Sequence, residues 1–237
     1  MWADEKLLFN RVQSLNERIP TSIAHSATPL HDGIRSNFML IASDLQCLNT
    51  YRYARSITGG IQEYMEAMTF KHYLESQTLI SYDVAGKQLN EMGGVNQPLV
   101  LSPEDYILGI FDMTGELMKF GITSMATSGS LPGSARTNLA EFHISSIEAG
   151  HLQSPSMRSG RDVLHDLREL RSHFEALNYG SDYHFVKEVD GKMAVMCTSV
   201  EKVEKALYGL IIRGSERPKG WLPSPDDGRG REEIETY

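Results

Sequence analysis

Two pairs of acidic residues lie inside largely apolar, helix-forming segments of this sequence. Glu63 and Glu66 are three residues apart, and Asp112 and Glu116 are four apart. At about 100° per residue, either spacing brings the paired carboxylates to one side of an α-helix. Ionised carboxylates in apolar surroundings need a counter-charge, and oxygen ligands in this number suit Mg²⁺ or Mn²⁺. The four acids therefore predict a divalent metal site.

The segment around the second pair is apolar over nearly its whole helical circumference. Asp105, Gly109 and the two acids form one narrow line on that helix. A helix with apolar residues all round is a buried helix. Salt bridges are the plainer explanation of the acids, because Lys119 follows Glu116 by one turn. One lysine on this line cannot neutralise four carboxylates, which favours a metal ion.

Composition limits the class of protein. A chain of 237 residues with 41% hydrophobic content can bury one core. We expect a single all-α domain over residues 1–217 and a flexible tail over residues 218–237, which is rich in Pro, Gly and charged residues. There is no apolar run of about eighteen residues and no signal-peptide pattern, so we expect an intracellular protein without a membrane span. The net charge of −8 argues against a chain that binds nucleic acid alone through a broad basic face.

Helices must position the acids, because apolar residues recur at steps of three and four along most of the chain. Residues 30–48 form one long amphipathic pattern, and residues 51–75 form the helix of the first acidic pair after a break at 49–50. The pair Gly59-Gly60 is expected to admit another backbone closely. Residues 86–98 are predicted to be a loop. Ser102 and Pro103, followed by two acids, predict the start of the second acidic helix.

The second half of the chain predicts further helices. Stretches rich in Ser and Gly at 126–136 and 153–160 predict loops around a short helix, and apolar stripes over 163–177 and 193–210 predict two more helices. Cys47 and Cys197 are expected in the core rather than in a disulfide or a zinc site. No strand pattern is visible, so the predicted fold is an all-α bundle of about six or seven helices.

Three segments of the sequence read SITGGIQEYMEAMTFKHYL, SPEDYILGIFDMTGELMKFGITS and VEKVEKALYGLIIRGSERPK. They resemble the translin family, in its TRAX (translin-associated factor X) branch, and the resemblance runs from about Arg11 to Lys219. It implies a translin-like all-α fold, a cytoplasmic and nuclear location, and assembly with translin into a closed hetero-oligomeric shell. In this family the shell is a Mg²⁺-dependent endoribonuclease for single-stranded RNA, and single-stranded DNA is a second candidate ligand. The family's catalytic acids correspond to Glu63, Glu66, Asp112 and Glu116.

Metal-assisted hydrolysis of a phosphodiester gives each acid a role. One or two carboxylate-held Mg²⁺ ions neutralise the phosphate, activate water and stabilise the leaving alkoxide. We assign Glu63, Glu66 and Asp112 as direct or water-mediated metal ligands, and Glu116 as a further ligand or as the base that orients the attacking water. Products should then carry 5′-phosphate and 3′-hydroxyl ends. Lys71, Lys119 and Arg213 are candidates for phosphate contact, and each is equally explained as a solvated surface charge.

Other functions are compatible with the same acids. An all-α nucleoside triphosphate pyrophosphohydrolase also uses an E-x-x-E helix and a second acidic helix with Mg²⁺, but its second motif is E-x-x-D rather than the D-x-x-x-E of this chain. A di-iron carboxylate bundle needs E-x-x-H, and Thr69 and Lys119 stand where the histidines would be. A non-catalytic single-stranded nucleic-acid-binding scaffold subunit would not need all four acids.

Overall fold

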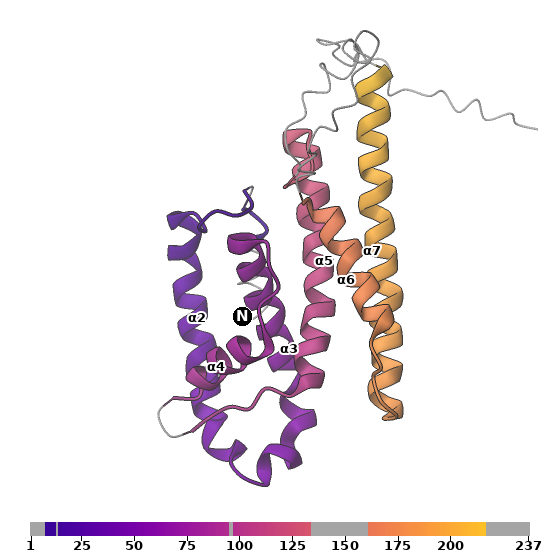
Figure 1. The fold of residues 1–237 in the computed structure, drawn as a ribbon. Coiled ribbons are helices and arrows are strands. Elements are labelled where there is room, and N and C mark those ends of the chain that lie inside the picture. The colour runs from indigo at the N-terminus through magenta and orange to yellow at the C-terminus, as the bar shows by residue number, and fades with distance from the viewer. Residues whose placement is uncertain (1–7, 13, 95–96, 134–160, 217–237) are drawn as a thin grey trace, which may run out of the picture.

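The structure is a computed structural model that describes residues 8–12, 14–94, 97–133 and 161–216. Every regular element in this part of the chain is helical, which confirms the predicted all-α fold. The elements are α2 (Thr21–Ala42), the 3₁₀ helix η1 (Ser43–Leu45), α3 (Asn49–Ser76), α4 (Tyr82–Met92), α5 (Pro103–Ser128), α6 (Val163–Ala176) and α7 (Tyr183–Glu216) (Figure 1). The short helix expected near residues 137–152 and the tail at 218–237 lie outside the described residues.

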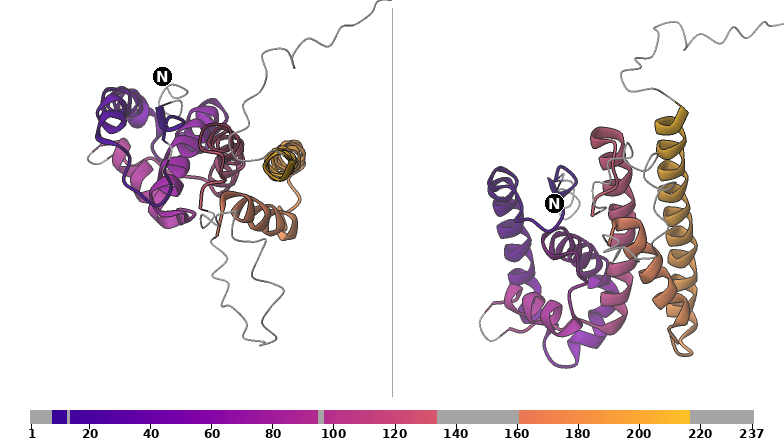
Figure 2. Two further views of the ribbon diagram at one scale, coloured as in Figure 1. Left: turned by 90° about the horizontal axis from the view of Figure 1, so that it is seen from above. Right: turned by 45° about the horizontal axis from the view of Figure 1, so that its top comes forward.

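Helix α5 is central, with α3 on one side and α7 on the other (Figures 1 and 2). Thr58 contacts Asp105 near the start of α5, and the rings of Phe70 and Phe120 lie 6.4 Å apart further along both helices. Helices α3 and α5 are therefore parallel. Helix α6 packs against α5 and α7, while α2 and α4 cover the other side of α3 and enclose a smaller core. None of the described helices is long and apolar enough to cross a membrane.

Local side-chain chemistry sets the ends of the central helix. The hydroxyl of Ser102 accepts a hydrogen bond from the backbone N–H of Asp105 at 3.0 Å, and Pro103 occupies the first helical turn. The sequence predicts both features. The helix ends at Gly129, whose φ of 68° is the left-handed conformation that favours glycine.

A buried carboxylate joins the end of α3 to the start of α6. Asp166 is almost fully buried and accepts hydrogen bonds from the Tyr73 hydroxyl at 2.6 Å, from the Gln77 amide at 3.0 Å, and from the guanidinium of Arg161. Burial, together with the hydrogen bond to Asp166, raises the pKa of Tyr73 far above its usual value. The hydrogen bond to Asp166 also raises the pKa of Arg161.

The backbone at residues 133 and 161 comes together beside this network. The N–H of Val163 donates to the carbonyl of Pro132 at 3.1 Å. Gly133 has a φ of +84°, and a Cβ atom there would lie 2.6 Å from the carbonyl oxygen of Arg161. Glycine is therefore required for both its conformation and its lack of a side chain. The described chain before residue 134 and after residue 160 is therefore in contact with itself.

Several predicted boundaries were wrong. Residues 86–98 were expected to form a loop, but α4 continues to Met92 because Ser81 caps it and Ala85 and Leu89 are buried. The first long helix begins at Thr21 rather than at residue 30, and its third turn accommodates an exposed Pro29. Helix α5 extends to Ser128, three residues into the predicted loop, and α7 begins ten residues earlier than its apolar stripe.

The bend between α2 and α3 also differs from expectation. Cys47 is exposed and has a φ of 56°, so it is a turn residue rather than a core residue. Cys197 is partly buried, and both thiols are free. Leu48, the last residue of the predicted apolar stripe, is 83% exposed. A Cβ atom on Gly59 would have no other atom within 4 Å, so this glycine serves no close backbone approach among the described residues.

Candidate functional site

The candidate site lies beside a close contact between α3 and α5. A Cβ atom on Gly109 would lie 2.5 Å from Cβ of Met65 and 3.3 Å from the carbonyl oxygen of Gln62. The missing side chain therefore lets the two backbones approach each other. Glycine does this at position 109 of α5, on the predicted acidic line, and not at Gly59 of α3.

The four predicted acids lie at or beyond this crossing on the two parallel helices, with Glu63 between Gln62 and Met65. Along α3, Glu66 lies between the crossing and Phe70, and along α5 both Asp112 and Glu116 lie between the crossing and Phe120. Glu66 is 5% exposed and Glu116 is 3% exposed, so each of the two helices carries one buried carboxylate. Glu63 and Asp112 are partly exposed.

Helix α7 supplies a partner for Asp112. Nζ of Lys192 donates to Oδ1 of Asp112 at 2.5 Å and to Oδ2 at 2.6 Å. The side chain of Lys192 is 21% exposed and that of Asp112 is 34% exposed, so solvent reaches this ion pair. No sequence pattern predicts the contact, because the two residues are separated by 80 positions.

Glu116 has two partners from different parts of the chain. Nζ of Lys119 donates to Oε1 at 2.8 Å, which is the salt bridge that the i,i+3 spacing suggested. The side-chain amide of Asn10 donates to Oε2 at 2.7 Å. Glu63 and Glu66 also have polar or electrostatic partners. Ammonium and amide groups thus occupy the carboxylates of the second pair in this structure.

The four carboxylates can be compared with the ligands that a divalent cation prefers. Carboxylate oxygens are the ligands that Mg²⁺ prefers, and two of these carboxylates are buried on helices that pack against each other. The residues therefore fit such an ion in type. In the side-chain arrangement seen here, no three His, Cys, Asp or Glu residues among those described converge as a metal site. The metal assignment stays a prediction.

Asp105, the first residue of the predicted acidic line, forms structural hydrogen bonds and is not one of the four predicted metal ligands. Its Oδ1 accepts hydrogen bonds from the Thr58 hydroxyl and, at 3.2 Å, from the Gln62 amide. Its Oδ2 accepts from the hydroxyl of Ser102 at 2.8 Å. These contacts hold the start of α5 against α3. Asp105 therefore stabilises the packing of the two helices that carry the acids.

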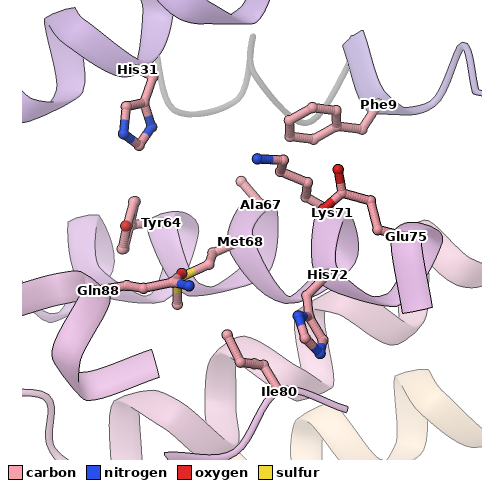
Figure 3. A pocket seen from close by; sticks show the side chains of 10 residues that line it. All are labelled: Phe9, His31, Tyr64, Ala67, Met68, Lys71, His72, Glu75, Ile80 and Gln88. Atoms are coloured by element: carbon pink, nitrogen blue, oxygen red, sulfur yellow. The ribbon is translucent and has the colours of Figure 1, made fainter. Parts of the chain in front are cut away.

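A groove beside the acids was not anticipated from the sequence. Two adjoining pockets of about 120 and 560 Å³ lie along α3, between α2 and residues 8–12. Figure 3 shows Lys71 reaching across the smaller pocket between His31 and Phe9. None of the four acids lines either pocket. Phe9 lines both of them, and the next residue, Asn10, binds Glu116.

Comparison with known proteins gives a consistent result. A family model described as the Translin family matches residues 6–214. The chain is 30% identical over 209 residues to translin-associated protein X of Mus musculus, covering 81% of this chain and 61% of that protein. It is 27% identical to a translin-associated protein X homolog of Schizosaccharomyces pombe, covering 73% of this chain and 59% of the relative.

The similarity extends to a second group of relatives. The chain is 26% identical over 187 residues to translin of Bos taurus, covering 76% of this chain and 68% of that protein. It spans about three fifths of the length of the relatives called translin-associated protein X. The family match covers the helices that carry the four acids and the groove beside them.

Proposed function

This chain belongs to the translin family, and from that premise we propose that it is the catalytic subunit of a translin-containing assembly. The assembly would be a Mg²⁺-dependent endoribonuclease that cleaves single-stranded RNA. One observation carries the proposal: Glu66 and Glu116 are buried carboxylates on two helices that pack against each other. Acidic side chains are rarely buried unless they are paired or bind a metal ion.

Each of the four acids would have a role in hydrolysis, either in binding the metal ion or in positioning water. Glu63, Glu66 and Asp112 would hold a divalent cation, with Mg²⁺ preferred and Mn²⁺ a substitute. Such an ion would supply charge neutralisation at the phosphate, an acidified water and stabilisation of the leaving oxygen. The Asn10 amide fixes one oxygen of Glu116 at 2.7 Å, which orients this carboxylate to position water or to accept its proton.

A translin partner is part of the proposal. The name of the relatives, translin-associated protein X, supports this choice. Large apolar side chains also gather at the bend from α2 to α3, where Leu40, Leu48 and Tyr51 are 76%, 83% and 84% exposed. Apolar side chains exposed in such number mark a surface that another chain can cover.

The first prediction concerns metal dependence. The complex of this chain with a translin partner should cleave labelled single-stranded RNA in Mg²⁺ and be inert in excess chelator. Glu66→Gln should lower the cleavage rate by about 100-fold or more, because the amide keeps the shape but loses the ligand charge. Glu201→Gln, at an exposed position of α7, is the matched control. Rates are measured with assembly checked by size-exclusion chromatography.

Two results would count against the proposal. Undiminished cleavage in chelator would remove the metal mechanism. Loss of folding in Glu66→Gln, with Glu201→Gln normal, would make Glu66 a structural residue. Mapping of the products should give 5′-phosphate and 3′-hydroxyl ends, and a 2′,3′-cyclic phosphate would point to attack by the ribose instead.

One observation favours a second candidate function, a non-catalytic nucleic-acid-binding subunit. Lys192 neutralises Asp112, and Lys119 neutralises Glu116. Acids satisfied in this way would stabilise the bundle without binding a metal ion. In that case the complex would bind single-stranded nucleic acid but cleave none, with or without Mg²⁺.

A further inference from the structure

Asn10 contacts the buried acid of α5 from a short segment at the start of the described chain. The amide nitrogen of its side chain donates to Oε2 of Glu116 at 2.7 Å. Phe9 and Val12, on either side of Asn10, are 2% and 3% exposed and belong to the same core as Leu117 of α5. The packing of its neighbours therefore holds Asn10 beside Glu116.

The oxygen of the same amide group has no partner. Oδ1 of Asn10 is the one buried side-chain nitrogen or oxygen that lacks a hydrogen bond in the part of the chain that the structure describes. An unpaired buried polar atom costs stability, so native proteins contain few of them. Such an atom commonly marks a functional group or a place where a water or an ion binds.

The orientation of the amide follows from its partner. An ionised carboxylate only accepts hydrogen bonds, so the amide nitrogen faces Glu116 and the amide oxygen faces elsewhere. Lys119 donates to the other carboxylate oxygen, Oε1, at 2.8 Å. The two amide atoms share one carbon, at bond lengths of about 1.2 and 1.3 Å, so Oδ1 lies within about 5 Å of Oε2.

A divalent cation is a suitable ligand for an oxygen in this position. Mg²⁺ takes an octahedral set of oxygen atoms at about 2.0–2.1 Å, and it usually keeps several waters. Two oxygens bound to one ion are therefore separated by at most about 4 Å, and a water between one of them and the ion lengthens this span. Amide oxygens bind hard cations as carboxylates do, and the negative charge of Glu116 favours a cation over a neutral molecule.

We propose that Oδ1 of Asn10 is a further oxygen ligand of the divalent cation, bound to it directly or through one water. The inference rests on the proposed function, because it adds a neutral ligand to the carboxylates assigned there. Asn10 then has two roles: its N–H group holds Glu116, and its oxygen faces the ion. Binding of the ion would also tie the segment at residues 8–12 to α5.

Electron-nuclear double resonance of bound Mn²⁺ tests this ligand without a measurement of activity. This chain is prepared with ¹³C in the side-chain carboxamide of asparagine, assembled with an unlabelled translin partner and loaded with Mn²⁺. The dipolar coupling between Mn²⁺ and ¹³C falls with the cube of their distance. The wild-type complex should show a ¹³C coupling, and its size distinguishes direct binding from binding through a water.

Substitutions at two asparagines assign the coupling. Asn10→Ala should remove it and weaken Mn²⁺ binding by about 10-fold or more, the range found when groups around a metal site are lost. Asn10→Asp keeps an oxygen in place and adds a negative charge, so it should bind Mn²⁺ at least as tightly as wild type. Asn16→Ala is the matched control, because the Asn16 amide also donates at 2.7 Å but to Gln77, and it should change neither measurement.

The outcomes separate this inference from the proposed function. If the wild-type complex binds Mn²⁺ and cuts RNA but shows no ¹³C coupling, Asn10 is not a ligand and the nuclease assignment stands. If the coupling is present and is lost in Asn10→Ala, but the wild-type complex cuts no RNA in Mg²⁺, the ligand assignment holds and the nuclease assignment fails. Weaker Mn²⁺ binding in Asn10→Asp than in Asn10→Ala would also overturn the ligand, and a wild-type complex that binds no Mn²⁺ would overturn both proposals.

Discussion

Lys192 and Asp112 form an ion pair that solvent can reach from α7. A pair of this kind can exchange one cation for another without leaving a bare charge in the core. Under the proposed function, the ammonium of Lys192 and a divalent ion compete for the same carboxylate. Lys192 then sets how readily the site takes up metal, in addition to stabilising the contact between α5 and α7.

We expect Lys192→Met to bind Mn²⁺ more tightly than the wild-type complex. The gain should be roughly 2- to 5-fold, because partly exposed ion pairs contribute up to about 1 kcal/mol. Direct titration of Mn²⁺, followed by electron paramagnetic resonance, measures it without relying on activity. Lys205→Met, which removes an exposed lysine paired with Glu201 on the same helix, should leave the affinity unchanged. Equal affinities in Lys192→Met and wild type would show that the pair does not compete with metal.

Sequence patterns identified the buried acids but not most of their partners. The spacing of Glu116 and Lys119 predicted their salt bridge, because three-residue neighbours share a helix face. Asn10 and Lys192 reach the acids from 106 and 80 residues away. Contacts over such distances depend on how helices pack in three dimensions. A single sequence carries no local signal for them.

Among the helices, the parallel packing of α3 and α5 decides where the carboxylates lie. Gly109 permits the close approach, and Asp105 holds the start of α5 through Thr58 and Gln62. The sequence predicted both helices and the N-cap at Ser102, because these depend on local chemistry. The close contact between helices was predicted at Gly59 instead of Gly109. Which residues of a neighbouring helix lie against a glycine cannot be inferred from the sequence of the glycine's own helix.

Two glycines of α5 provide a matched test of this packing. Gly109→Ala should destabilise the chain by about 1–3 kcal/mol, because the new methyl would overlap Met65 and push the helices apart. Gly115→Ala, further along the same helix with nothing within 4 Å of the added Cβ, should stabilise the helix by up to about 1 kcal/mol. Urea unfolding followed by circular dichroism measures both. Equal effects of the two substitutions would contradict the close approach.

The whole chain carries a net charge of −8, which opposes the approach of a polyanion. The groove along α3 contains two cationic side chains, Arg18 and Lys71, although the chain as a whole is acidic. The acids beside them add to the repulsion unless a cation neutralises them. A translin partner that covers the exposed bend at Leu48 and Tyr51 could also contribute basic surface, so RNA affinity belongs to the assembly rather than to the single chain.

We therefore expect the isolated chain to bind single-stranded RNA far more weakly than the complex with translin. Binding of one labelled RNA is compared for the two preparations across a salt series, with the oligomeric state of each determined by light scattering. The difference should narrow as salt rises, because screening removes the chain's own repulsion. A monomeric chain that bound and cut RNA as well as the complex would make the partner unnecessary.

The meeting of residues 133 and 161 has a consequence for how this domain tolerates change. Because Gly133 lies against Arg161 and the N–H of Val163 donates to the carbonyl of Pro132, the described chain at residues 133 and 161 is held together by its own contacts. The entropy of closing a flexible loop grows only with the logarithm of its length, by about 0.6 kcal/mol for each doubling. A change in the number of residues between positions 133 and 161 should thus cost little free energy of unfolding and leave the acidic helices as they are.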